Sequence, residues 1–141
     1  MENLSVEVSA VIAPEHLQPI DAGLTAFNTD MTGYNDHLPL SVVIRCNETQ
    51  EVLGGILGRT YLGILFIDLV YLPSELRSKG LGEKLLTHAE EEGRNRGCIS
   101  AFLYTISFQA PEFYKKHGWE EFGRIACLPE GASRIFMKKT L

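Results

Sequence analysis

A turn with two glycines, placed between an apolar strand-like run and an amphipathic helix pattern, constrains the fold more than any other feature. The stretch reads ELRSKGLGEKLL over residues 75–86. Gly80 and Gly82 stand where the helix begins, although glycine is a poor helix former. Main-chain N–H groups at a helix N-terminus are unsatisfied and partly positive, and glycines let a phosphate approach them without a Cβ in the way. The sequence therefore predicts a phosphate-binding turn. Its neighbouring cations are Arg77, Lys79 and Lys84.

Two other nucleotide-binding motifs fit this stretch less well. A Rossmann turn requires GxGxxG, but Leu85 occupies the third glycine position. A Walker loop requires GxxxxGK[ST], and the sequence has no such run. The alternative is that Gly80 and Gly82 only shape a strand-to-helix turn.

The hydrophobic pattern elsewhere predicts strands interspersed with helices. Alternating apolar residues over 4–12 predict a strand, and Pro14 suits the start of one helix, or of two short ones, ending near residue 29. A hairpin is predicted over 40–61, and the best helix over 79–96. The other expected elements are strands over 63–72, 98–106, 119–125 and 133–141 and a short helix over 110–118.

This order predicts an α+β fold, with a mixed and largely antiparallel sheet covered by helices. A length of 141 residues suits one domain, so residues 1–141 are predicted to form a single domain.

Composition narrows the possible partners. The net charge of -5 argues against non-specific binding to nucleic acid or an anionic membrane. The three cysteines, Cys46, Cys98 and Cys127, lack metal-ligand spacing, so we expect no metal site. The chain start lacks a signal-peptide pattern, and no apolar run approaches the ~20 residues that span a bilayer. We therefore expect a cytoplasmic protein.

Two motifs resemble those of the GNAT superfamily of N-acetyltransferases. Arg77, Gly80 and Gly82 match R/Q-x-x-G-x-G/A, which follows a strand in that family. The downstream stretch SFQAPEFYKKHGW, residues 107–119, fits the family pattern N-x-x-A-x-x-F-Y-x-x-x-G-F. The matching residues in it are Ala110, Phe113, Tyr114, Gly118 and Trp119.

This resemblance implies a GNAT-like fold with splayed central strands, helices on both faces and acetyl-CoA as cosubstrate. It implies that the backbone at Val70 and Leu72 pairs with the pantetheine arm, and that Tyr114 protonates the departing thiolate. It also implies that the turn amides hold the pyrophosphate, at Arg77, Ser78, Lys79, Gly80, Leu81 and Gly82. The family asparagine falls at Ser107, with Gln109 nearby, and either side chain could replace its contact to the coenzyme.

The acceptor chemistry calls for a base. An alkyl amine with a pKa of about 10.4 is almost wholly protonated at neutral pH. Asp68 is the candidate base, because burial within an apolar strand would raise its pKa. Its alternative role is to orient a neighbouring backbone group or to cap a bulge. Glu75, in the following loop, is interpreted as a solvated charge.

The acceptor pocket is expected to involve Tyr34, Asn35 and Tyr104, with Asp30 and Asp36 able to attract a cationic amine. The predicted reaction transfers acetyl from acetyl-CoA to a primary amine of a small molecule, by direct attack in a ternary complex. A non-catalytic domain that senses acyl-CoA, and an acetyltransferase acting on a protein amine, are the alternatives. A homodimer is left open, since the closing strands could pair between subunits.

Overall fold

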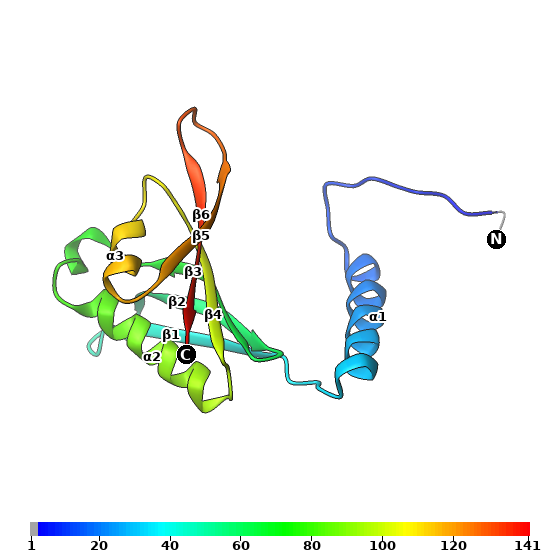
Figure 1. The fold of residues 1–141 in the computed structure, drawn as a ribbon, viewed down its shortest axis with the longest axis horizontal. Helices are drawn as coiled ribbons and strands as arrows, with labels where there is room; N and C mark the ends of the chain where they lie inside the picture. The colour runs from blue at the N-terminus through cyan, green and yellow to red at the C-terminus, as the bar shows by residue number, and fades with distance from the viewer. Residues whose placement is uncertain (1–2) are drawn as a thin grey trace. The chain divides into compact units, whose positions relative to one another are not determined.

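The computed structural model describes residues 3–141 and divides the chain into two compact units (Figure 1). The first unit is Met1–Asn35, and the second is Asp36–Leu141. Each is described by itself below. The prediction of a single domain over residues 1–141 stays a prediction.

The N-terminal unit contains one helix, α1 (Pro14–Thr32). Pro14 occupies the first turn, where its missing N–H costs nothing, and Gly33 ends the helix in the left-handed conformation with φ of 77°. The predicted helix is confirmed, as a single helix rather than two. None of its residues is buried.

The strand predicted over residues 4–12 is wrong, because this stretch is extended but forms no strand. Val6 and Val8 are 99% and 98% exposed. An alternating pattern becomes a strand only when another strand supplies a hydrogen-bonding ladder. The described part of the N-terminal unit contains no strand that could do so.

The C-terminal unit is built on one six-stranded sheet, in the order β1-β2-β3-β4-β6-β5. The strands are β1 (Leu38–Arg45), β2 (Val52–Tyr61), β3 (Ile64–Tyr71), β4 (Ser100–Ile106), β5 (Glu120–Ala126) and β6 (Ser133–Thr140). The helices are the short 3-10 helix η1 (Ser74–Leu76), α2 (Leu81–Asn95) and α3 (Pro111–Lys116). All strand pairs are antiparallel except β3 with β4. The mixed, largely antiparallel fold is therefore confirmed.

The parallel pair β3–β4 separates after three residue pairs. Pairing runs from Ile64↔Ser100 to Phe66↔Phe102 and then stops. Beyond this point β3 continues to Tyr71 beside β2, and β4 continues to Ile106 beside β6. The central strands are splayed, and the edge of β3 that faces the opening has no strand partner.

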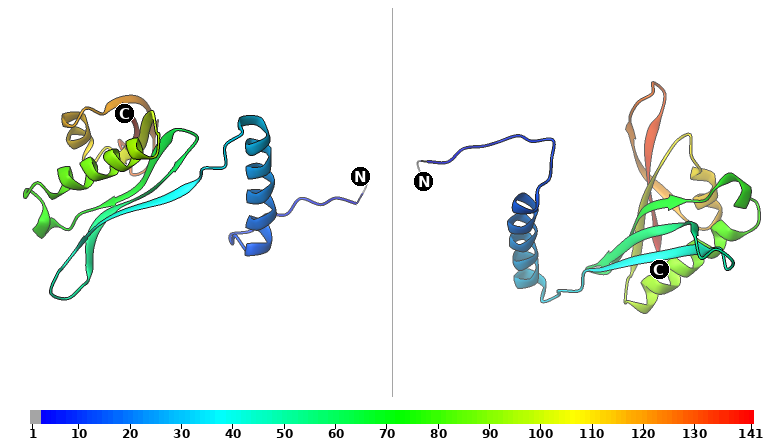
Figure 2. Two further views of the ribbon diagram at one scale, coloured as in Figure 1. Left: turned by 90° about the horizontal axis from the view of Figure 1, so that it is seen from below. Right: turned by 180° about the vertical axis from the view of Figure 1, so that it is seen from behind.

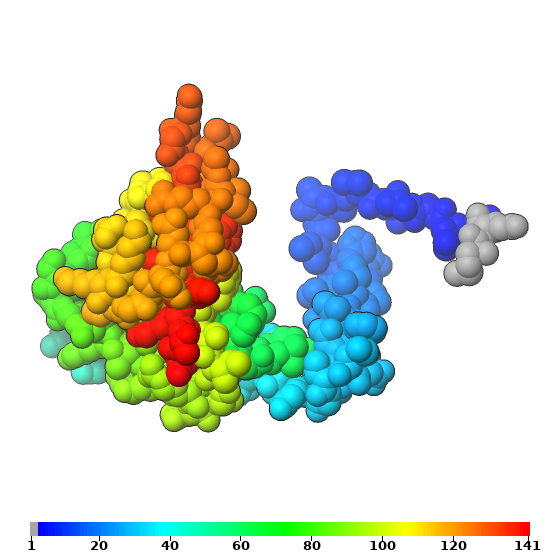
Figure 3. Space-filling view, viewed as in Figure 1, coloured from blue at the N-terminus to red at the C-terminus, as the bar shows by residue number. Residues whose placement is uncertain are grey.

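One face of this sheet carries the hydrophobic core. Leu65, Leu103 and Met137 on this face are at most 2% exposed. They form a single cluster with Leu85 and Leu86 of the amphipathic helix α2, and with Tyr114 of α3. Figures 1 and 2 show α2 and α3 together on this side of the sheet, and Figure 3 gives the space-filling view in the orientation of Figure 1. Among residues 3–141, no helix is long and apolar enough to cross a membrane.

The opposite face of the sheet carries a cluster of aromatic rings, which we call the aromatic face. Phe102 lies 6.1 Å from Phe66 and 6.2 Å from Phe136, measured between ring centroids. Tyr104 and Phe122 complete the cluster and are 44% and 51% exposed. Neither α2 nor α3 covers this face.

A buried ion pair ties the end of the sheet to α2. The Glu90 carboxylate is 2.6 Å from Lys139 Nζ and accepts a hydrogen bond from Trp119 Nε1 at 3.2 Å. The Nη2 atom of Arg94 lies 3.7 Å from Glu90 Oε1. Glu90 is 5% exposed, so its charge needs these partners.

We expect Lys139→Met to lower the free energy of unfolding by about 2–4 kcal/mol, because it removes a partner from a buried carboxylate. Urea denaturation followed by circular dichroism measures the change. Lys116→Met is the control, since Lys116 is exposed and makes no ion pair within residues 3–141. Equal unfolding midpoints for the two variants would contradict the stabilising role of this pair.

Candidate active site

The turn before α2 presents a run of main-chain N–H groups without acceptors. The first helical hydrogen bond runs from Lys84 N to Gly80 O at 3.2 Å, and no side chain caps the helix. Within residues 3–141, the amides from Ser78 to Glu83 donate to no protein acceptor. Ser78 and Gly80 have positive φ angles of 63° and 75°, so the backbone curls tightly here. Such a concave run of amides at a helix N-terminus suits a phosphate group.

Arg77 fixes this turn to the end of β3. Its Nε donates to Leu72 O at 2.9 Å, and its amide donates to Ser74 O at 3.2 Å. The free amides therefore begin at Ser78, one residue later than the sequence suggests. Lys79 and Lys84 make no ion pair within the described residues, so their charges are available to an anion.

The end of β3, the start of α2 and the helix α3 meet at one place. A Cβ added to Gly82 would lie 3.3 Å from Phe113 Cζ and 3.9 Å from Leu72 Cδ2. Val70 is 43% exposed, in the part of β3 whose edge toward β4 has no strand partner, and Leu72 packs against the core. The predicted pantetheine and pyrophosphate residues thus form one continuous surface.

Tyr114 lies beside this surface with its ring buried. It is 7% exposed and packs edge-on against Phe113 and Trp119. Burial raises the pKa of its phenol to about 12, so the hydroxyl stays protonated at neutral pH. The hydroxyl makes no hydrogen bond in the described part of the chain. It is not among the fully buried polar atoms that lack a partner, so part of its surface is accessible to solvent. A protonated, accessible hydroxyl can donate a proton.

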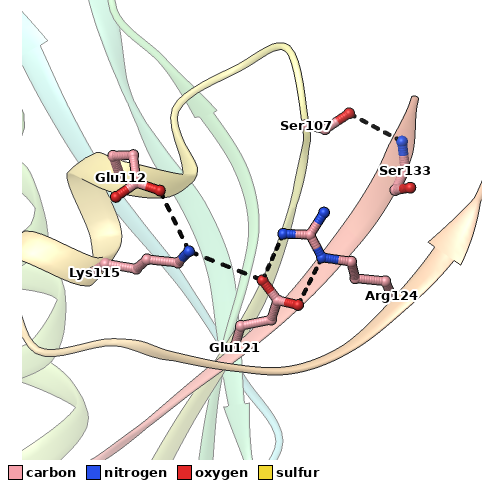
Figure 4. Close-up of polar contacts among 6 residues, drawn as sticks. All are labelled: Ser107, Glu112, Lys115, Glu121, Arg124 and Ser133. Carbon is pink, nitrogen blue, oxygen red and sulfur yellow. Dashed lines mark hydrogen bonds and ion pairs between the residues drawn. The ribbon is translucent and has the colours of Figure 1, made fainter. Parts of the chain in front are cut away.

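Ser107 and Gln109 both hold the loop between β4 and α3. Ser107 Oγ accepts a hydrogen bond from Ser133 N at 3.0 Å (Figure 4). Gln109 Oε1 accepts from Ile106 N at 2.8 Å and from Thr105 Oγ1 at 3.2 Å. Both residues shape the loop that leads to Tyr114, and their contact with a coenzyme stays a prediction.

The same close-up shows charged residues that connect α3 to β5. Glu121 accepts two hydrogen bonds from Arg124 and lies 4.0 Å from Lys115 (Figure 4). The hydrogen bonds from Arg124 lower the pKa of the Glu121 carboxyl. This cluster links the short helix that carries Tyr114 to β5.

Asp68 is not buried, which corrects the premise of the sequence interpretation. Its side chain is 48% exposed and lies on the aromatic face, 3.4 Å from Arg59 Nε. The β2–β3 register shifts at this point, so that Asp68 forms a bulge opposite Leu57 and Gly58. A Cβ on Gly58 would collide with the Phe66 carbonyl oxygen, which explains the glycine there. A role for Asp68 as base stays a prediction.

The predicted acceptor residues lie in both units. Tyr104 is on β4, at the border of the splay, with its ring under the guanidinium of Arg134 at 4.9 Å. Tyr34 and Asn35 follow the end of α1 in the N-terminal unit, and their contribution to an acceptor site stays a prediction.

The sequence did not point to two arginines that lie near the predicted site, Arg59 and Arg134. Arg59 forms an ion pair with Asp68, and its Cζ lies 4.2 Å from the centroid of the Phe66 ring. The guanidinium of Arg134 lies over the ring of Tyr104. Their positions depend on the strand register, which places Arg59 opposite Phe66 and Arg134 beside Tyr104. No spacing within the sequence could have shown these pairings.

A run of free amides beside an unpaired strand edge and a protonated phenol is an arrangement that suits an extended ligand carrying phosphates. The sequence model of the Acetyltransferase (GNAT) family matches residues 12–119. The chain therefore belongs to the GNAT acetyltransferase family, and it is an acyltransferase.

Relatives and solved structures agree with this assignment. The chain is 34% identical to acetyltransferase Atu2258 of Agrobacterium fabrum over 94% of its own length and 96% of that protein. It is also 34% identical to the blasticidin-S acetyltransferase of Streptomyces morookaense, over 68% of its length and 71% of that protein.

Among solved structures, an acetyltransferase from Bacillus cereus matches with a TM-score of 0.83 and 30% identity, covering 100% of both chains. An aminoglycoside 6'-N-acetyltransferase complexed with coenzyme A has a TM-score of 0.60 at 18% identity, over 82% of this chain and 78% of that one. This last likeness shows the fold alone.

We expect Gly82→Trp to weaken coenzyme A binding by more than about 100-fold, because the indole would fill the space in front of the free amides. Isothermal titration calorimetry measures the affinity. Gly23→Trp is the matched control, since nothing lies within 4 Å of a Cβ at Gly23. An unchanged affinity in a folded Gly82→Trp protein would refute the phosphate-binding turn.

Proposed function

We propose that this protein is an N-acetyltransferase that transfers acetyl from acetyl-CoA to a primary amine of a small molecule, by direct attack in a ternary complex. The observation that supports it most is the run of unsatisfied amides from Ser78 to Glu83, next to the unpaired edge of β3. We also propose that both units serve one GNAT domain in the cytoplasm.

The residues present fit the coenzyme. The amides of the turn and the cations Lys79 and Lys84 would hold its pyrophosphate. The backbone from Val70 to Leu72, at and just after the end of β3, would pair with its pantetheine amides as an added strand would. The bound coenzyme supplies the thioester that carries the acetyl group. Arg77 would act by fixing the turn, since its guanidinium is bonded to Leu72 O.

Tyr114 would donate a proton to the leaving sulfur. A pKa of about 12 keeps its hydroxyl protonated, so it can donate to the thiolate as the carbon–sulfur bond breaks. The acceptor amine must also lose a proton in order to attack the thioester. Asp68 would accept it directly or through water, from the aromatic face of the sheet.

Similarity supports a small-molecule acceptor. The relative that covers 68% of this chain is named for acetylating blasticidin S. The half-exposed ring of Tyr104 borders the splay and would suit an acceptor with a planar or apolar part. A screen of amines with acetyl-CoA, read by thiol release, tests the proposal. Tight coenzyme binding with no turnover of any amine would instead favour a sensing role.

We expect Tyr114→Phe to lower kcat by about 10²–10⁴-fold while the affinity for coenzyme A changes by less than a few fold, because only the proton donor is lost. Thiol-release kinetics and calorimetry give the two numbers. Phe113→Leu, a neighbour without a hydroxyl, controls for packing. If Tyr114→Phe keeps wild-type kcat, the acid role is wrong.

We expect Asp68→Asn to lower kcat by about 10²-fold or more at neutral pH, because an amide cannot accept the proton. The loss should shrink as the pH approaches the pKa of the amine, where the free base is already present. Glu75→Gln removes an exposed carboxylate in the loop after β3 and serves as the control. A pH-independent change of equal size in both variants would count against Asp68 as base.

A further inference from the structure

Glu90 is a buried charge that the proposed mechanism does not use. It lies on α2 and is 5% exposed. Its carboxylate has two close partners, the ammonium of Lys139 at 2.6 Å and the indole N–H of Trp119 at 3.2 Å. Because well-packed apolar residues in place of a buried ion pair are often as stable or more so, stability alone is a weak reason for a carboxylate here. The positions of its partners indicate a second role.

Both partners of Glu90 lead to the turn that ends α3. The main-chain N–H groups of His117 and Trp119 each donate to Tyr114 O at 3.0 Å. Lys139 Nζ, which is paired with Glu90, also donates to His117 O at 2.8 Å. One carboxylate on α2 therefore holds the residues that follow Tyr114 at two points, through the indole and through the lysine.

Helix α3 needs support from its surroundings. It has six residues, and no side chain caps its start at Ala110. A helix of this length is not stable by its own hydrogen bonds. The ring of Tyr114 packs edge-on against Phe113 and Trp119, and Trp119 is 3% exposed. The single side-chain N–H of Trp119 donates to Glu90, so the placing of the phenol depends on where Glu90 holds the indole.

Helix α2 also begins at the turn of free amides. These amides run from Ser78 to Glu83, and Glu90 lies about two helical turns beyond Glu83. One helix thus carries the proposed pyrophosphate site at its start and the anchor of the Tyr114 segment further along. The distance between the two sets where the phenol lies relative to the sulfur of a coenzyme held at the turn. A misplacement of about 1 Å in such a site can cost about 10²-fold in rate.

We propose that Glu90 is a positioning residue for acetyl transfer, which keeps the Tyr114 hydroxyl within reach of the leaving sulfur by way of Trp119 and Lys139. This inference rests on the acid role proposed for Tyr114. Glu90 acts only through its two partners. Its replacement therefore changes the chemical step and leaves the free amides, and with them the coenzyme affinity, almost unchanged.

Nuclear magnetic resonance of protein with isotope-labelled tyrosine rings tests the positioning without an acceptor amine. The signal that is absent in Tyr114→Phe belongs to Tyr114. In the wild type this signal is expected to shift with coenzyme A, and not with adenosine 3′,5′-bisphosphate, which lacks the thiol arm. In Glu90→Leu the coenzyme A dissociation constant, measured by calorimetry, is expected to stay within about threefold of the wild type, while the shift is lost.

The two ways to fail give different results. If the Tyr114 signal of the wild type does not respond to bound coenzyme A, the role of Tyr114 at the sulfur is wrong, and the inference fails with it. If the wild type and Glu90→Leu show equal shifts, Glu90 does not position the phenol, and the acid role stands.

Leu40→Ala is the control for a general loss of stability. Leu40 is a buried core residue on β1, at the edge of the sheet opposite β5. This variant is expected to unfold at a lower urea concentration than the wild type and to keep the Tyr114 shift. Loss of the shift in Leu40→Ala as well would show that any loosening of the core has this effect, and would overturn the proposal.

A double-mutant cycle gives the kinetic test. With acetyl-CoA and an amine that the wild type acetylates, Glu90→Leu is expected to lower kcat by about 10–100-fold. Because Glu90 acts through Tyr114, the same change is expected to add no further loss to Tyr114→Phe. Losses that multiply would overturn the proposal. Glu90→Gln keeps an oxygen for the indole N–H, so it is expected to give the same pattern with a smaller loss, and it replaces Glu90→Leu if that variant does not fold.

Discussion

The structure depends on the early separation of β3 from β4. Three residue pairs join these strands, and beyond Phe66↔Phe102 the sheet opens. An unpaired strand edge inside a sheet leaves main-chain groups without partners, which is costly unless a ligand or water satisfies them. The turn before α2 has the same property, since its amides also lack acceptors. Both defects lie next to each other, so one extended ligand with amides and phosphates can satisfy both.

The fold of the C-terminal unit could be predicted from the sequence because its signals are local. The Gly80–Gly82 turn, the apolar face of α2 and the stop at Gly97 each depend on residues close in the chain. The strand over residues 4–12 failed for the opposite reason. Its alternating valines indicate a strand, but a strand also requires a partner, and pattern alone does not supply one.

The residues of the candidate site show the same contrast between local signals and tertiary placement. The glycines of the turn and Tyr114 were identified by motif, and the structure brings the turn and α3 together through Gly82 and Phe113. The burial of Asp68 was predicted from its apolar neighbours and was wrong. A bulge changes the direction of the residues that follow it, and the shift between Leu57 and Gly58 turns Asp68 outward toward Arg59. Strand register is a tertiary property, so the sequence could not show it.

The two faces of the sheet have different chemical roles in this arrangement. The core face is covered by α2 and α3, and the buried Glu90–Lys139 pair joins the sheet to α2, so the turn before α2 stands on a packed core. The aromatic face keeps Tyr104 and Asp68 accessible but leaves apolar rings exposed to water. Exposed apolar surface of this kind is typical of a binding site for a ligand or a partner. An acceptor that lies against Tyr104 would be held at the border of the splay, so the same exposed ring would shape what the enzyme accepts.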